Sequence, residues 1–131
     1  MVPVVICHKS REKANVVASI TAIGDVAGKN IVIVDDMIDT AGTLAKAANV
    51  LKEMGALSVR ACATHAIFSG PAYERIADSA LEEVIVSDTI PLSNDPSKDK
   101  SKITVLSMTD IFANIIGKVY NYEEISSSFI N

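Results

Sequence analysis

The segment from Ile31 to Thr43 constrains the fold more than any other part of this chain. It reads IVIVDDMIDTAGT, so four β-branched residues are followed at once by two acids and then by small residues. A continuous β-branched run is typical of a parallel strand that is buried on both faces, and this strand should end at Asp35 and Asp36. The apolar spacing from Leu44 to Met54 predicts a helix. The pattern therefore indicates a strand-to-helix turn at the carboxyl edge of a sheet, where ligands bind in α/β folds.

The small residues of this turn suit a phosphate group. They would lie at a helix N-terminus, where unpaired backbone N–H groups favour an anion. Thr40 and Thr43 can add hydroxyl donors, and Gly42 would let the backbone approach the ligand closely. The predicted phosphate loop consists of Asp39, Thr40, Ala41, Gly42 and Thr43.

Three carboxylates accompany the predicted phosphate loop. The side chains of Asp35 and Asp36 diverge, and they can accept hydrogen bonds from two ribose hydroxyls or hold a hydrated Mg²⁺ ion. Asp39 is interpreted as an N-cap of the following helix, or as an acceptor for a ribose or water proton, because a carboxylate repels a phosphate. The alternative explanation of these residues is an ordinary polar turn after a buried strand, with Asp39 as its cap.

Composition and charge exclude several classes of protein. The chain has 131 residues, 49% of them hydrophobic, which is enough to bury one core. No apolar segment is long enough to span a bilayer and no signal peptide precedes the first strand, so we expect a cytoplasmic protein without a membrane partner. A net charge of −4 argues against a nucleic-acid partner. Cys7 and Cys62 lie in separate apolar runs, and we expect both to be reduced and packed.

The rest of the chain predicts a single α/β domain with a central, mainly parallel sheet. Basic residues, among them Lys9 and Arg11, cluster on an expected hairpin loop, which composition alone would make a solvated charged turn. The last predicted helix carries an apolar stripe that belongs either to the core or to an interface. The expected strands are Pro3–Cys7, Val16–Ile23, Ile31–Val34, Leu57–Ala63, Glu83–Val86 and Ile103–Ser107, and the expected helices are Leu44–Met54, Ala72–Ala80 and one beginning near Thr109.

The run IVIVDDMIDTAGT resembles the signature of the type I phosphoribosyltransferase fold. From Val4 to Phe129 the chain resembles the C-terminal half of the ribose-phosphate pyrophosphokinase family, in which Asp39 is the discriminating residue of a D-T-G/A-G-T pattern. Further matching segments are Gly24-Asp25-Val26-Ala27-Gly28-Lys29, Ala63-Thr64-His65, Phe68-Ser69-Gly70-Pro71-Ala72, Ser79-Ala80-Leu81, Glu83-Val84-Ile85-Val86 and Thr89-Ile90-Pro91-Leu92-Ser93. The resemblance implies a three-layer fold, in which helices flank the sheet, with a flexible β-hairpin near the N-terminus. It also implies that residues 1–131 form one domain, the C-terminal half of a two-domain enzyme without its N-terminal domain.

The resemblance implies a reaction as well. Members of this family transfer diphosphate from ATP to the anomeric hydroxyl of ribose 5-phosphate, which gives phosphoribosyl pyrophosphate and AMP for nucleotide biosynthesis, with Mg²⁺ as cofactor. Lys9 and Arg11 would be the catalytic residues of the hairpin. The ribose 5-phosphate site would comprise Arg11, Asp35, Asp36, Asp39, Thr40, Ala41, Gly42 and Thr43. The family forms homo-oligomers, dimers that assemble into hexamers, and its adenine-binding residues belong to the absent half, so this chain alone should lack turnover.

Parts of the chain depart from the family pattern and leave alternatives open. His8 stands where family members commonly have an acidic residue, and Ser10 stands where they commonly have a basic one. Ser126 aligns with one position of a C-terminal Ser-x-Ser segment that helps bind a regulatory phosphate or ADP, although ordinary C-terminal fraying explains a serine run equally well. A non-catalytic regulatory subunit associated with a synthetase and a nucleobase phosphoribosyltransferase remain alternatives. Retention of Lys9 and Arg11 favours catalysis.

Overall fold

A computed structural model describes residues 6–10 and 19–128 of the chain, with side chains from Gly24 onward. Four parallel strands form one sheet in the order β3-β4-β5-β6, and two antiparallel strands, β1 and β2, form a second sheet. The predicted α/β fold with a mainly parallel sheet is therefore confirmed. The elements are β1 (Ile6–Ser10), β2 (Ser19–Ile23), β3 (Asn30–Ile38), α1 (Gly42–Glu53), β4 (Ser58–Ala66), α2 (Ala72–Asp78), β5 (Glu83–Ser87), β6 (Ile103–Leu106), α3 (Thr109–Tyr120) and the 3-10 helix η1 (Ser126–Ser128).

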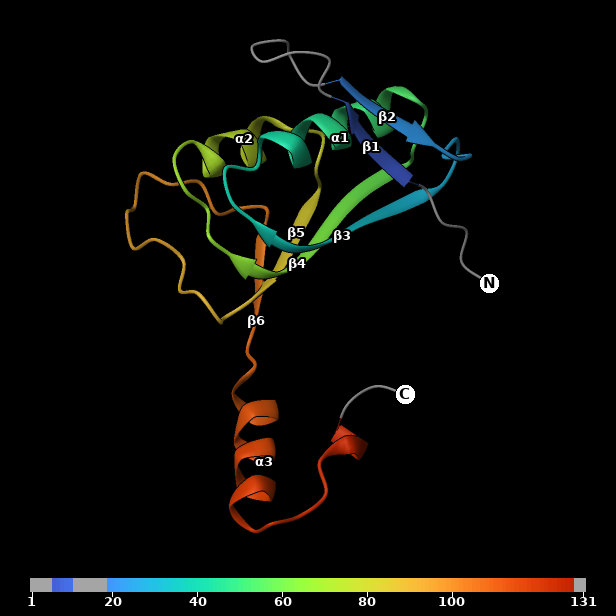
Figure 1. The fold of residues 1–131 in the computed structure, drawn as a ribbon. Coiled ribbons are helices and arrows are strands. Elements are labelled where there is room, and N and C mark those ends of the chain that lie inside the picture. The colour runs from blue at the N-terminus through green and yellow to red at the C-terminus, as the bar shows by residue number, and fades with distance from the viewer. Residues whose placement is uncertain (1–5, 11–18, 129–131) are drawn as a thin grey trace.

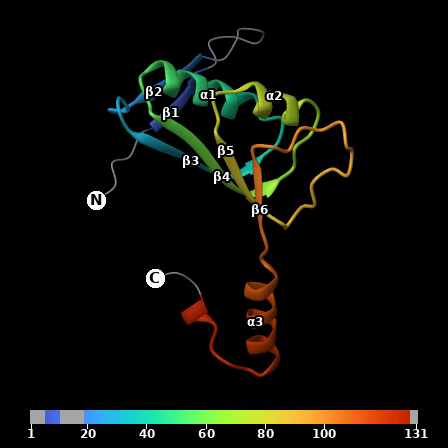
Figure 2. The same cartoon turned by 180° about the vertical axis from the view of Figure 1, so that it is seen from behind.

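The core lies between the four-stranded sheet and the helices α1 and α2, which cover the same face of that sheet (Figures 1 and 2). Its best-buried large side chains come from both layers and include Leu51, Ile76, Leu81, Val59 and Val84. Among the described residues no helix packs on the other face. Of the three predicted layers, the described residues form two, the sheet and one layer of helices.

Strand β3 differs from its sequence prediction in two ways. It does not end at Val34, because its pairing with β4 continues to Ile38, opposite Ala66. It is also not buried on both faces, since Val32 is 58% and Val34 is 76% exposed. Both valines lie on the sheet face that no described helix covers, and β3 pairs only with β4 among the described strands. The two acids therefore belong to the strand, and the turn begins at Asp39.

The predicted N-terminal hairpin is present and lies beside α1 (Figure 1). Its register pairs Ile6 with Ile23 and Ser10 with Ser19. Lys9 is consequently a strand residue, paired with Ile20, and not the loop residue that the sequence predicted, because the ladder continues one position beyond it. Arg11 lies outside the described residues.

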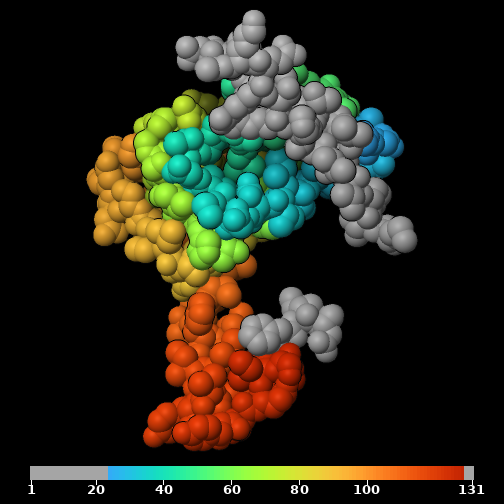
Figure 3. Space-filling model, viewed as in Figure 1, coloured from blue at the N-terminus to red at the C-terminus, as the bar shows by residue number. Residues whose placement is uncertain are grey.

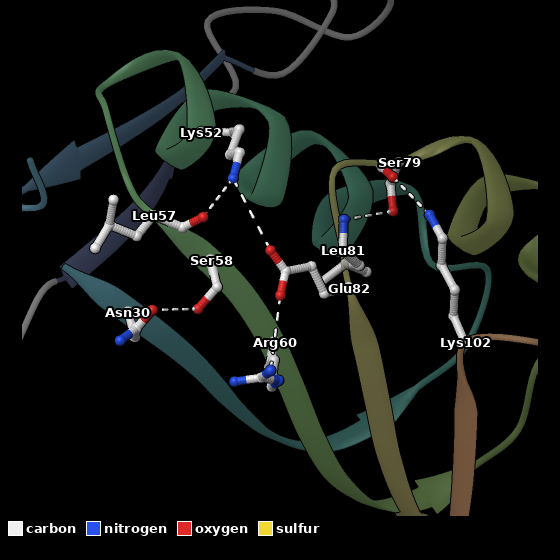
Figure 4. Close-up of polar contacts among 9 residues, drawn as sticks. All are labelled: Asn30, Lys52, Leu57, Ser58, Arg60, Ser79, Leu81, Glu82 and Lys102. Carbon is white, nitrogen blue, oxygen red and sulfur yellow. Dashed lines mark hydrogen bonds and ion pairs between the residues drawn. The ribbon is translucent and has the colours of Figure 1, made fainter. Parts of the chain in front are cut away.

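The amino-terminal edge of the parallel sheet is fastened by polar side chains (Figure 4). Ser58 Oγ donates to Asn30 Oδ1 at 2.7 Å, which joins the first residues of β4 and β3. Arg60 forms ion pairs with Glu82 at 3.7 Å and with Glu83 at 3.5 Å. The opposite, carboxyl-terminal edge of the sheet carries the turn after β3.

Helix α3 extends away from the sheet and its two helices. Figure 3 shows α3 and η1, in orange and red, as a projection from the rest of the molecule. No residue of α3 is buried, and Phe112 and Ile116 are 52% and 65% exposed. The apolar stripe predicted for this helix therefore does not belong to the described core, and its role as an interface remains a prediction. Within the part of the chain that the structure describes, no helix is long and apolar enough to cross a membrane.

Candidate functional site

A short turn between β3 and α1 surrounds a small pocket at the carboxyl edge of the sheet. The pocket has a volume of about 170 Å³. It is lined by Asp35, Met37, Ile38, Asp39, Thr40, Ala41, Gly42, Thr43 and Leu44. The structure thus brings together six of the eight residues that the resemblance assigned to ribose 5-phosphate; Asp36 does not line this pocket, and Arg11 is not among the described residues.

Backbone conformation at Ala41 shapes the turn. Ala41 is the N-cap residue of α1, it lies in the left-handed region with a φ of 57°, and no side chain caps the helix. Its carbonyl accepts the first helical hydrogen bond, from Ala45 N at 2.9 Å. Amide groups in the first turn of a helix have no intrahelical acceptor, so they can donate to an anion. The left-handed residue is thus Ala41 and not the neighbouring glycine.

Asp39 is held by the segment that follows β4. Ser69 Oγ donates to Asp39 Oδ1, and Ser69 N donates to Asp39 O at 3.1 Å. One residue earlier, Phe68 N donates to Ile38 O at 3.1 Å. The interpretation of Asp39 as an N-cap is therefore wrong, because its carboxylate is engaged by Ser69 and the N-cap position belongs to Ala41.

Gly42 contacts an arginine of the neighbouring helix. The side chain of Arg75, in α2, donates from Nη1 to Thr40 O at 2.9 Å. A Cβ atom on Gly42 would lie 3.1 Å from the same Nη1 atom. Gly42 does not have a positive φ, so its lack of a side chain serves this close approach of Arg75.

Asp35 and Asp36 are the carboxylates predicted to hold a cation, and of the two only Asp35 lines the pocket at the turn. Both side chains are exposed, and Asp35 Oδ1 accepts a hydrogen bond from Asp36 N at 2.9 Å. Among the described residues, no group of three or more His, Cys, Asp or Glu side chains could hold a metal ion. Two carboxylates with solvent access fit Mg²⁺, which keeps several waters and takes further ligands from substrate phosphates.

A second pocket, about 260 Å³ in volume, adjoins the first on the uncovered face of the sheet. Asp35 lines both pockets. Other lining residues are mostly apolar, and they include Val34, Cys62, Ile85, Leu106 and Met108. This apolar pocket extends the site from the turn across the ends of β4, β5 and β6.

His65 has a structural partner at the end of β4. Its Nδ1 atom lies 2.9 Å from Thr89 Oγ1, and that hydroxyl also donates to Thr64 O at 3.1 Å. Ser87 Oγ donates to Thr64 O at 2.6 Å. These contacts fasten the residues after β5 to β4, so His65 has a structural hydrogen-bonding role.

Similarity to known proteins decides the family of this chain. The family model described as "Phosphoribosyl synthetase-associated domain" matches residues 3–130. The chain belongs to the phosphoribosyl synthetase-associated domain family. The resemblance noted in the sequence is thereby confirmed, and the fold and turn described above are those of a phosphoribosyl synthetase-associated domain.

Curated relatives of this phosphoribosyl synthetase-associated domain are ribose-phosphate pyrophosphokinases. That of Wolinella succinogenes is 55% identical over 126 residues, which are 96% of this chain and 40% of the relative. That of Campylobacter jejuni is 53% identical over 127 residues, 97% of this chain and 40% of the relative. A crystal structure of phosphoribosylpyrophosphate synthetase from Mycobacterium smegmatis matches with a TM-score of 0.81 and 42% identity, over 92% of this chain and 38% of that one. The chain spans about two fifths of the length of the curated relatives it matches.

Sequence reasoning missed two residues that hydrogen-bond to this domain's turn, Ser69 and Arg75. Both lie more than 25 positions from the residues they contact, since Ser69 bonds to Asp39 and Arg75 to Thr40. The order of the elements offers one signal. The carboxyl ends of neighbouring parallel strands lie at the same edge of a sheet, so the segment after β4, which contains Ser69 and leads into the helix of Arg75, is expected near the turn after β3.

Proposed function

We propose that this chain is the ribose 5-phosphate-binding part of a ribose-phosphate diphosphokinase. The observation that carries the proposal is the turn from Asp39 to Thr43, which gathers a helix N-terminus and hydroxyl-bearing side chains around a pocket of about 170 Å³. Anions bind well at such helix ends, since backbone N–H groups there point at the ligand and the helix dipole favours negative charge. The names of the relatives, ribose-phosphate pyrophosphokinases, support a ribose phosphate as that anion.

In the proposed reaction, the anomeric hydroxyl oxygen of ribose 5-phosphate attacks the β-phosphorus of ATP. The new oxygen–phosphorus bond forms as the bond to the α-phosphate oxygen breaks, the hydroxyl loses its proton, and AMP leaves. The turn holds the 5-phosphate, and Asp35 and Asp36 accept hydrogen bonds from ribose hydroxyls, so the sugar is oriented for attack. ATP and residues outside this chain complete the site, in keeping with a chain that spans two fifths of its relatives.

Mg²⁺ is the proposed cofactor. Asp35 and Asp36 would hold it through water. When bound, Mg²⁺ neutralises charge on the phosphates during transfer.

Lys9 and Arg11 are the proposed catalytic residues of the hairpin. Cationic side chains stabilise the negative charge that develops in phosphoryl transfer, and Arg11 suits a bidentate contact with phosphate. Lys9 and Arg11 would approach the phosphates of ATP when the hairpin closes over bound substrates. Ser126 is proposed to contribute to a regulatory anion site.

The proposal also covers assembly and location. Residues 1–131 would be the C-terminal domain of a cytoplasmic two-domain enzyme that forms dimers and hexamers. The exposed apolar side chains of α3, such as Phe112 and Ile116, suit an interface in that assembly. This chain alone should therefore bind ribose 5-phosphate without turnover.

Calorimetric titration of ribose 5-phosphate into this chain, with and without Mg²⁺, tests the proposal. We expect binding that Thr43→Ala and Asp35→Asn weaken, and that Mg²⁺ strengthens only while Asp35 is intact. Thr104→Ala is the matched control, because Thr104 bonds to Glu83 at the opposite edge of the sheet. Absence of binding to the folded chain would contradict the proposal, as would equal affinity in the Thr43→Ala variant.

A further inference from the structure

We infer that Arg75 is a positioning residue for the phosphate loop, and that it aims the Ala41 N–H group at the bound phosphate. This inference rests on the proposed function and adds a residue to its site. The structural basis is the hydrogen bond of 2.9 Å from Arg75 Nη1 to Thr40 O. Arg75 donates to the backbone of the loop but does not line the pocket, which is formed by residues 35 and 37–44.

The peptide group between Thr40 and Ala41 connects Arg75 with the ligand. The described chain has no cis peptide bond, and in a trans peptide the C=O and N–H groups point in opposite directions. Because Arg75 fixes the Thr40 carbonyl on the side of α2, the Ala41 N–H group points away from α2. No acceptor among the described residues takes up this N–H group. It is therefore oriented to donate to an anion in the loop.

Arg75 reaches the loop from a rigid base. Its neighbours in α2, Tyr73 and Ile76, are 3% and 1% exposed, and the Tyr73 ring packs edge-to-face on Phe68 with centroids 5.3 Å apart. The backbone of α2 is thus anchored in the core, and the guanidinium projects from it over Gly42. A planar guanidinium on a fixed helix is preorganised for such a contact.

The charge of Arg75 matters as well as its hydrogen bond. Asp35 and Asp39 line the pocket, so without a nearby cation the loop would repel an anion. In the part of the chain with described side chains, Arg75 is the cationic residue that contacts the loop. It offsets these carboxylates while Ser69 engages Asp39.

The test compares Arg75→Ala and Arg75→Lys with the unchanged chain. Ribose 5-phosphate and inorganic phosphate are titrated by calorimetry, and the Thr40 carbonyl and Ala41 amide resonances are followed by NMR in the free proteins. We expect Arg75→Ala to weaken both ligands about tenfold, the loss of one charge-assisted hydrogen bond, and to shift both resonances. Arg75→Lys should recover part of the affinity, because an ammonium keeps the charge and one donor.

Arg60→Ala is the matched control, since Arg60 is an exposed arginine whose ion pairs with Glu82 and Glu83 lie at the opposite edge of the sheet. It should leave affinity and loop resonances unchanged. If the unchanged chain binds ribose 5-phosphate and Arg75→Ala binds it equally well, the inference is overturned and the proposed function stands. If the folded, unchanged chain binds neither ligand, the proposed function is overturned, and the loop resonances alone decide whether Arg75 positions the turn.

Discussion

Ser69 holds Asp39 twice, by a hydrogen bond from its hydroxyl to Asp39 Oδ1 and by another from its amide to Asp39 O at 3.1 Å. The backbone bond fixes where the loop leaves β3, and the side-chain bond fixes the direction of the carboxylate. Both groups are exposed, so their contribution to folding is small. We expect their main effect on ligand binding, because the Ser69 hydroxyl hydrogen-bonds to the negative Asp39 carboxylate at a site that is proposed to bind a phosphate.

Ser69→Ala should weaken ribose 5-phosphate binding by about threefold to tenfold, because it releases the Asp39 carboxylate beside the anion. The melting temperature should change little, since the backbone bond remains. Calorimetry and thermal unfolding measure the two effects. In an Asp39→Asn background the same substitution should have a smaller effect on affinity, and an undiminished effect would show that Ser69 acts without Asp39.

Ala41 is 5% exposed and adopts a φ of 57°, so substitutions there report backbone strain. The left-handed conformation costs a non-glycine residue about 1–2 kcal/mol. Ala41→Gly removes that strain. It also removes a buried methyl group worth about 0.8 kcal/mol, and it stabilises the unfolded chain by a similar amount because glycine has more conformational entropy there. These effects nearly cancel, so the free energy of unfolding should barely change.

Ala41→Val should instead lower the free energy of unfolding by about 2 kcal/mol or more, because a β-branched residue is strongly strained at this φ. Ala27→Val, at an exposed position without a positive φ, is the control. Urea unfolding measures the free energy of unfolding of each variant. Equal stability of Ala41→Val and the unchanged chain would mean that the turn is not left-handed at this residue.

The sequence predicted most elements of this fold because their signals are local. Apolar runs such as Glu83–Val86 and the helical spacing after Gly42 depend on residues a few positions apart, and they identified β5 and α1. The turn from Asp39 to Thr43 was also predicted from one continuous run, and its role as a phosphate loop remains a prediction. These features were predictable because neighbours in the chain determine them.

Features that depend on distant partners were not predictable. The β-branched run of β3 indicated burial on both faces, yet Val34 is exposed because the helices of the described residues cover only one face of the sheet (Figure 2). The strand assignment of Lys9 depends on its pairing with Ile20. Arg75 carries no signal of its own in the sequence, since its role exists only where α2 meets the loop.

The carboxylate of Asp88 should titrate abnormally. Ser107 Oγ donates to Asp88 Oδ2 at 2.7 Å and Met108 N donates to Oδ1 at 2.8 Å, and these bonds hold the pKa of the Asp88 carboxyl below its ordinary value. A pKa that is lower in the folded than in the unfolded chain stabilises the fold above the unfolded value of about 3.9, and this contribution disappears as the pH falls through the folded pKa. We therefore expect the junction between β6 and α3 to loosen only in acid.

NMR titration of the Met108 amide measures this effect. Its resonance should move with a midpoint below about 3.9 in the unchanged chain, and it should lose that transition in Asp88→Asn, which does not titrate. A midpoint at or above the unfolded value would show that the two hydrogen bonds do not favour the charged form.

Lys102, in the turn just before β6, caps the carboxyl end of α2, so Lys102→Met should destabilise the fold. Its Nζ donates to Ala77 O at 2.7 Å and to Ser79 O at 2.9 Å (Figure 4 shows the contact with Ser79). A cation at a helix C-terminus is favourable, and methionine keeps the apolar stem while it removes the hydrogen bonds and the charge of the ammonium. We expect the free energy of unfolding to fall by about 1–2 kcal/mol, seen as a lower urea midpoint with an unchanged slope. Lys100→Met is the control, because Lys100 makes a single bond of 3.3 Å to Asp95 O, and equal losses in both variants would refute the assigned role of Lys102.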